Sequence, residues 1–139
     1  TAGKKEFLYG RFEVRAKIPV SGGAWPAIWA LGSGMEWPSC GEIDIMEYYR
    51  IKGEPHILAN AAWGTDWQWN ARWNSKAIPF THFTDKDPAW ADKFHIWRMD
   101  WDETVIKIYL DDELLNEILL SETGIPMRYE IDYVRVYQK

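Results

Sequence analysis

The sequence contains a single cysteine, no long apolar run and no cluster of basic residues. Cys40 has no second cysteine with which to form an internal disulfide, so packing must stabilise the fold. No stretch is long and apolar enough to span a membrane, and no charged start leads into an apolar segment, so we expect neither a membrane helix nor a signal peptide within this chain. The formal charge is -5 and the Lys and Arg residues are scattered, which argues against nucleic acid as a partner.

Tryptophan, by contrast, is abundant. Ten of the 139 residues are Trp and aromatic residues make up 16% of the chain, while hydrophobic residues at 47% are enough for the core of one domain spanning residues 1–139. Several of the Trp residues lie beside Gly, Pro, Asn or Asp rather than among aliphatic residues. Flat rings with a polar edge can stack on sugar faces, so composition leaves a Trp-rich core and a carbohydrate-binding surface equally open.

Alternation of apolar and polar residues with period two predicts an all-β, antiparallel sandwich. We expect no helix, internal repeat or linker. Segment 64–88 is rich in Trp, Asn, Thr and Asp, and we expect it to be an irregular loop, which at that length is usually functional or poorly ordered. The expected strands are 8–18, 25–31, 42–49, 56–63, 94–101, 105–110, 114–119 and 128–137.

Three carboxylates lie close together in the third expected strand, in the run Glu42-Ile43-Asp44-Ile45-Met46-Glu47. Side chains 42 and 44 project to one face of a strand, whereas residue 47 is an odd step away and would project to the other. A β-bulge at Ile45-Met46 adds one residue and brings Glu47 back beside the other two acids. The spacing therefore predicts a bulge at this point.

Two carboxyl groups on one face can flank a single bond. A separation of about 5 Å is typical of retaining glycosidases, in which one carboxylate attacks the anomeric carbon and the other protonates the leaving oxygen. Asp44 lies between the two glutamates. Crowded like charges at low dielectric should raise one pKa, and we expect one glutamate to stay protonated near neutrality.

Several other interpretations of the same residues are open. The acidic strand could be an exposed edge without function, or it could bind calcium, although calcium prefers flexible loop oxygens. Zinc would need His or Cys, and Cys40 and His56 form no ligand pattern. A thiol mechanism with Cys40 as nucleophile and a histidine as base has no support from the spacing. The histidines considered as its base are His56, His82 and His95.

The chain resembles glycoside hydrolase family 16 along nearly its whole length. The Gly-Glu-Ile-Asp-Ile-Met-Glu run at 41–47 is the most specific of the matching segments. The others occur in the order found in the family. They are 9–19, 25–31, 94–101 and 132–137.

The resemblance implies a β-jelly roll of the concanavalin A-like type, with a sugar-binding cleft across its concave sheet and hydrolysis with retention. It implies that Glu42 is the nucleophile, Asp44 the residue that holds it, and Glu47 the general acid/base. The inserted Met46 is similar to the bulged laminarinase, agarase and carrageenase branches, and within that group the whole chain most resembles the laminarinases. The implied substrate is therefore β-1,3-glucan, and the implied location is secreted, periplasmic or at the cell surface. The candidate substrate-binding residues are Trp25, Trp29, Asn60, Trp63 and Trp101.

The chain also departs from the family. The family's strands before the Tyr9 segment and a stretch near residues 123–125 have no counterpart here, and 59–63 stands where many members carry a histidine. Missing strands leave edges unpaired, so we expect association through those edges. No cofactor is expected to be required. A family calcium site would include Asp132, with its other ligands largely from the N-terminal strands.

Three functions compete on the sequence. An enzyme would need all three acids, a lectin-like carbohydrate-binding module would bind sugar without needing Glu42, and an inactive fragment of a catalytic domain would do neither. The intact acidic run favours the enzyme, and the missing segments favour the fragment.

Overall fold

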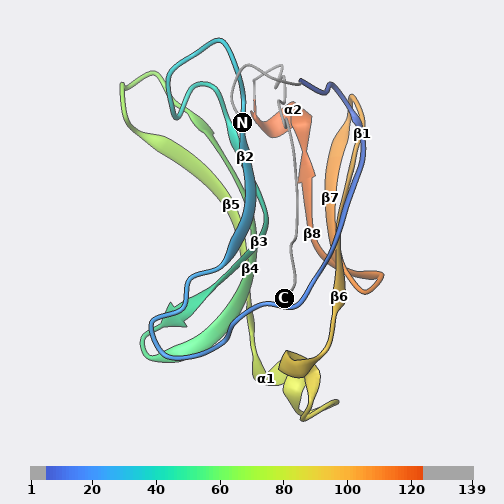
Figure 1. Ribbon diagram of the computed structural model, residues 1–139. Helices are drawn as coiled ribbons and strands as arrows, with labels where there is room; N and C mark the ends of the chain where they lie inside the picture. The colour runs from blue at the N-terminus through green and yellow to red at the C-terminus, as the bar shows by residue number, and fades with distance from the viewer. Residues whose placement is uncertain (1–5, 124–139) are drawn as a thin grey trace.

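A computed structural model describes residues 6–123 as two four-stranded antiparallel sheets that face each other (Figure 1). The acidic sheet, which carries Glu42, has the order β2-β3-β4-β5. Its partner, the opposite sheet, has the order β1-β6-β7-β8. The predicted all-β antiparallel sandwich is confirmed.

Strand bounds follow the alternation closely. The acidic sheet comprises β2 (Ala27–Leu31), β3 (Glu42–Ile51), β4 (Glu54–Gly64) and β5 (Ala71–Pro79). The opposite sheet comprises β1 (Gly10–Ala16), β6 (His95–Trp101), β7 (Val105–Leu110) and β8 (Glu113–Leu119). The last expected strand, 128–137, lies outside the described residues.

The expectation of an irregular loop over 64–88 was wrong. Strand β5 occupies 71–79 and pairs with β4 without interruption, from His56 opposite Pro79 to Gly64 opposite Ala71. Its side chains are half-buried or exposed throughout, so it lacks the apolar alternation by which a strand is recognised in sequence. Pairing with the backbone of a buried neighbour stabilises it instead.

Single helical turns also occur where no helix was expected. They are α1 (Thr81–Thr84), η1 (Trp90–Asp92) and α2 (Leu120–Thr123). Segments of three or four residues are too short to show a 3.6-residue period, which is why the pattern missed them. Among the described residues, no helix is long and apolar enough to cross a membrane.

The core lies between the sheets and combines aliphatic and aromatic side chains. Ile43, Ile45 and Met46 of β3 are at most 1% exposed and belong to the same buried cluster as Trp97 and Ile108 of the opposite sheet. Burying a side chain of this size stabilises the fold by about 1.5–3 kcal/mol. The bulged strand is thereby fixed against the core through the residues between its acids.

The ten Trp residues divide between core and surface. Four are buried, five are exposed and Trp37 is half-buried. The core interpretation therefore holds for the buried Trp residues, and a carbohydrate-binding surface remains a prediction for the exposed ones. The buried ones are Trp63, Trp90, Trp97 and Trp101, and the exposed ones are Trp25, Trp29, Trp67, Trp69 and Trp73.

Candidate active site

Strand β3 carries the predicted bulge. Asp44 pairs with Asn60 of β4 and Glu47 with Leu58, so two residues, Ile45 and Met46, oppose one residue of β4. The register with β2 shifts at the same place. The extra residue restores Glu47 to the face of Asp44, as the odd spacing required. The predicted bulge is confirmed.

Hydrogen bonds show that the acids share this face. The side-chain amide of Asn60 donates to Glu47 Oε2 at 2.8 Å and to Asp44 Oδ2 at 3.4 Å. Asn60 is 3% exposed and lies directly opposite Asp44 in the register. A buried amide that bridges two carboxyl groups holds them at a fixed spacing. Asn60, predicted as a substrate-binding residue, thus contacts the acids themselves.

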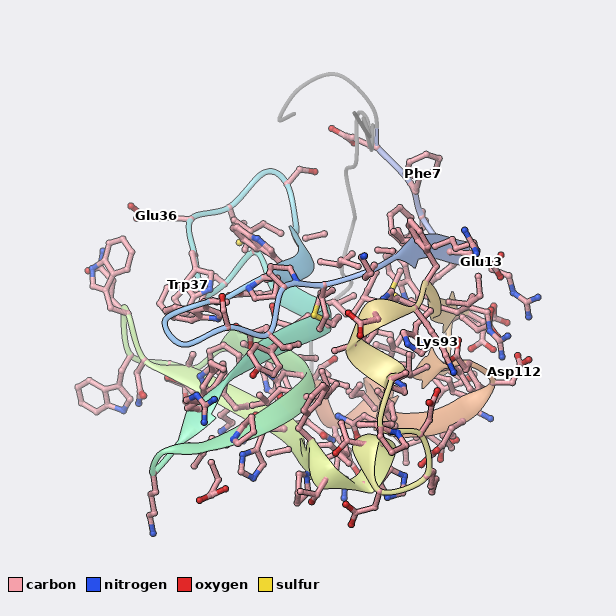
Figure 2. All side chains as sticks on the ribbon, turned by 60° about the horizontal axis from the view of Figure 1, so that its bottom comes forward. Phe7, Glu13, Glu36, Trp37, Lys93 and Asp112 are labelled. Carbon is pink, nitrogen blue, oxygen red and sulfur yellow. The ribbon has the colours of Figure 1, made fainter. Side chains whose placement is uncertain are left out.

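Each glutamate also accepts an indole N–H. Trp25 Nε1 donates to Glu47 Oε1 at 3.1 Å, and Trp37 Nε1 donates to Glu42 Oε2 at 2.6 Å. These two hydrogen bonds orient the carboxyl groups that accept them. Figure 2 places Trp37 in the loop before β3, across the molecule from Glu13 and Asp112.

Asp44 is the deeply buried member of the cluster, with 2% of its surface exposed. Burial, together with the charges of Glu47 and Glu42, raises its pKa to about 8. The side-chain amide of Asn60 donates a hydrogen bond to the Asp44 carboxyl group, which partly lowers this pKa. At neutral pH Asp44 is therefore mostly protonated and can donate a hydrogen bond to Glu42. The raised pKa found here is that of Asp44, and the glutamate that the same crowding was predicted to keep protonated remains a prediction.

Two predicted tryptophans lie beside the acids. Trp29 pairs with Asp44 across β2 and β3 and is 52% exposed. Trp25 is 70% exposed, contacts Tyr49 edge to face, and bonds to Glu47. Directly paired residues of neighbouring strands project to the same side of a sheet. Trp29 therefore borders the acidic face, the side of the acidic sheet that carries Glu42, Asp44 and Glu47. Trp25 borders it too, because its indole bonds to Glu47. An open face with two solvated indoles and two carboxyl groups suits a sugar ring.

The structure does not bring Trp63 and Trp101 to this face. Asn60 and Ala62 pair with Asp44 and Glu42 and project to the same side of the sheet as these acids. Trp63 is an odd number of residues from both, so it projects to the other side of β4, where it is 8% exposed. Trp101 is 5% exposed and packs in the core on β6 of the opposite sheet. The expectation that these two rings line the groove was wrong, because Trp density in sequence does not give the face of a strand.

Sequence reasoning missed three residues of the acidic face. Trp37 was assigned to a loop without a role, although it lies five residues before Glu42. Tyr49 follows Glu47 by two residues on the same strand; its pKa is raised by burial and then by the charges of Glu47 and Asp44. Trp73 could not be placed because β5 was not foreseen. It pairs with Ala62, which in turn pairs with Glu42.

The thiol alternative finds no support in the geometry. Cys40 is buried, its pKa is raised by that burial, and its thiol donates to the backbone oxygen of Gly41. Each histidine has a partner elsewhere: His56 the backbone oxygen of Glu54, His82 the Glu113 carboxylate, and His95 both Asp111 and the Trp90 carbonyl. Within the described residues, no histidine is therefore placed to act as a base for the thiol.

A metal site remains a prediction. Among residues 6–123, no group of three His, Cys, Asp or Glu side chains is arranged to hold a metal ion. Asp132, the predicted calcium ligand, lies outside the described residues.

Comparisons with known proteins agree on one family. The model of "Glycosyl hydrolases family 16" matches residues 1–137. A β-1,3-glucan-binding protein of Penaeus monodon is 40% identical over 113 residues, covering 78% of this chain and 31% of the relative. A β-glucanase of Rhodothermus marinus is 38% identical over 126 residues, covering 82% of this chain and 39% of the relative. The laminarinase catalytic domain of Thermotoga maritima MSB8 matches with TM-score 0.68 and 31% identity, covering 92% of this chain and 53% of that one. The chain thus spans about a third to a half of these relatives' lengths.

Proposed function

The chain belongs to glycosyl hydrolase family 16, and on that premise we propose that it cleaves internal bonds of a laminarin-type β-1,3-glucan with retention of configuration. The observation that carries the proposal is the bulge in β3, which sets Glu42, Asp44 and Glu47 on one face. Exposed Trp25 and Trp29 flank that face and offer flat surfaces to a sugar chain.

In the proposed reaction, Glu42 attacks the anomeric carbon while Glu47 gives its proton to the departing glycosidic oxygen. Water then attacks the glycosyl-enzyme, transfers a proton to Glu47 and releases Glu42 as a carboxylate. Four N–H or O–H donors orient Glu42 and Glu47 for these steps. They are Trp25, Trp37, Asn60 and protonated Asp44.

Asp44 has a distinct part in this scheme. Being mostly neutral near pH 7, it adds little negative charge beside the attacking oxygen and donates a hydrogen bond to Glu42. The same bond restrains rotation of the Glu42 carboxyl group. Asp44 thus acts through Glu42 and is a positioning residue.

Specificity for β-1,3 linkages rests on similarity. The inserted Met46 resembles the laminarinase branch, and the relatives include a β-glucanase and a laminarinase domain. Because such polymers are too large to enter a cell, we also propose that the protein acts at the cell surface or after secretion. No nucleic acid or membrane partner enters this proposal.

One relative supports a second function. The Penaeus monodon relative is named as a glucan-binding protein rather than a hydrolase. A lectin-like module would use Trp25 and Trp29 for stacking and would be indifferent to the charge of Glu42.

Release of reducing ends from laminarin, lichenan, agarose and carrageenan separates these functions. We expect release from laminarin by the parent chain and none by Glu42→Gln, which keeps the size and a hydrogen-bonding group of the side chain. Glu103→Gln, on an exposed turn of the opposite sheet, is the matched control and should retain the parent's rate. Binding of laminarin without any release would favour the binding module, and neither binding nor release would favour the inactive fragment.

A further inference from the structure

Three of the most exposed aromatic rings gather on one hairpin, outside the residues assigned above to the reaction. Trp67, Trp69 and Trp73 are 75%, 54% and 48% exposed. Trp67 and Trp69 lie in the connection between β4 and β5, and Trp73 lies near the start of β5. In the described part of the chain, none of these rings stacks on another aromatic ring. Large solvated apolar rings in a group are characteristic of a binding surface.

The connection that presents the rings is ordered by its own hydrogen bonds. The Thr65 hydroxyl donates to the Asn70 carbonyl at 2.9 Å and accepts the Trp67 amide at 3.3 Å. The Asn70 amide donates to the Trp67 carbonyl at 3.1 Å. The rings therefore project from a defined turn, so little backbone freedom is lost when a ligand binds.

Trp69 adopts a conformation that its side chain disfavours. Its φ is 64°, in the left-handed region, where a bulky residue costs roughly 1–2 kcal/mol and glycine costs almost nothing. A half-exposed indole at such a position gains little from burial. Contact between the Trp69 ring and a ligand would explain why this left-handed position holds a tryptophan rather than a glycine.

The hairpin is held in a fixed place relative to the candidate active site. A Cβ at Gly64, the last residue of β4, would lie 2.8 Å from Ser39 Oγ and 3.0 Å from Ser39 Cα, so the loop before β3 packs tightly on the hairpin base. That loop carries Trp37, the donor to Glu42. In Figure 1, the β4–β5 connection and the β2–β3 loop project from the same end of the acidic sheet.

Trp73 connects the hairpin to the acids. It pairs with Ala62, and Ala62 pairs with Glu42, so the three share one row across β3, β4 and β5. Two strand spacings separate Trp73 from Glu42 along this row, about 10 Å. Trp73 is therefore in register with Glu42, on the same side of the acidic sheet.

We propose that Trp67, Trp69 and Trp73 form a second glycan platform, which binds a stretch of the same β-glucan chain away from the bond being cleaved. The proposal rests on the function proposed above and extends it to long polymers. Polar side chains separate the rings, namely Gln68, Asn70 and Arg72, and all are solvated enough to bond sugar hydroxyls. Indoles alternating with hydrogen-bonding groups suit a sugar chain better than the continuous apolar core of a protein interface.

The test compares long and short ligands in a background that cannot hydrolyse them. In Glu42→Gln, calorimetric titration with laminarin polymer and with laminaritriose gives two affinities. Adding Trp67→Ala and Trp69→Gly should weaken polymer binding roughly tenfold or more and leave the trisaccharide affinity unchanged. Glycine at 69 relieves the left-handed strain, so this double substitution should not unfold the chain. The control is Leu114→Ala, which replaces an exposed apolar residue on β8 of the opposite sheet and should change neither affinity.

Other outcomes overturn the platform. Equal losses for polymer and trisaccharide would make the rings part of the cleft, and unchanged polymer affinity would leave them without a ligand. A parent dimer that the substitutions convert to a monomer, measured by light scattering, would assign the rings to a contact between copies. If the Glu42→Gln chain binds no laminarin, both the platform and the proposed function fail. If the parent cleaves the polymer but Trp67→Ala with Trp69→Gly leaves polymer binding unchanged, only the platform is refuted.

Discussion

Replacing Asp44 by asparagine should increase stability at neutral pH. The asparagine side chain has the shape of a protonated aspartic acid, cannot ionise, and keeps an N–H that can donate to Glu42. The folded state raises the pKa of Asp44 from 3.8 to about 8, mainly through burial and then through Glu47 and Glu42. Since the folded chain holds this proton more tightly than the unfolded chain, its contribution to stability is complete below pH 4 and is lost as the pH rises toward 8.

The size of the effect follows from the same shift. Between pH 3.8 and pH 7 the parent loses up to about 1.4 kcal/mol per pH unit, or about 4 kcal/mol at pH 7. This figure is an upper limit, because entry of water and movement of side chains relieve part of the burial cost. Asp44→Asn removes this loss, so its advantage over the parent should be small at pH 4 and should grow steadily to pH 7.

Urea unfolding of both proteins at pH 4, 5, 6 and 7 measures the difference directly. Titrating groups far from Asp44 behave alike in both chains, so the difference in unfolding free energy reports on residue 44 together with the two glutamates beside it. Asp85→Asn, at an exposed helix end, is the matched control and should stay parallel to the parent. A constant offset between Asp44→Asn and the parent across this range would refute the raised pKa. A lower stability of the variant at pH 7 would show that Asp44 is charged and held by its donors.

Three further predictions concern the donors, the roles of the glutamates and the sheet edges. Trp37→Phe removes the indole donor to Glu42 and should lower kcat roughly 10- to 100-fold, the worth of a hydrogen bond to a charged group; an unchanged kcat would show that the bond has no catalytic role. Added azide should restore turnover of Glu47→Ala by attacking the glycosyl-enzyme, which gives a glycosyl azide of retained configuration. In Glu42→Ala azide should attack the substrate directly and give the inverted product, and swapped products would reverse the two roles. Within the described part of the chain, β2 and β5 are the edges of the acidic sheet, so the chain should self-associate in sedimentation experiments, whereas a concentration-independent monomer would show that the edges are closed.

Sequence alternation predicted the fold well wherever a strand has one buried face. Strands β6 and β7 alternate buried and half-buried residues without exception, so their bounds are recovered within a residue. Strand β5 was missed because it has little burial on either face and is an edge of its sheet among residues 6–123. Strand β5 forms because its backbone pairs with β4, and the residue pattern within 71–79 does not reveal that pairing.

The acids of the candidate site were predictable for a different reason. An odd spacing of acids within an otherwise apolar strand can be reconciled only by a bulge, and the register confirms that bulge. The donors around the acids were not predictable, since Trp37 and Asn60 reach them from a loop and from a neighbouring strand. Trp63 and Trp101 were assigned to the groove by residue type, and burial shows that residue type does not distinguish a stacking ring from a core ring.

Retention at the anomeric carbon is the central claim of the proposed mechanism, and proton NMR of early laminarin hydrolysis tests it directly. Retention predicts that newly formed reducing ends appear first as the β-anomer, with the α-anomer rising only later through mutarotation. Initial appearance of the α-anomer would mean a single displacement by water, and Glu42 could not then be the nucleophile.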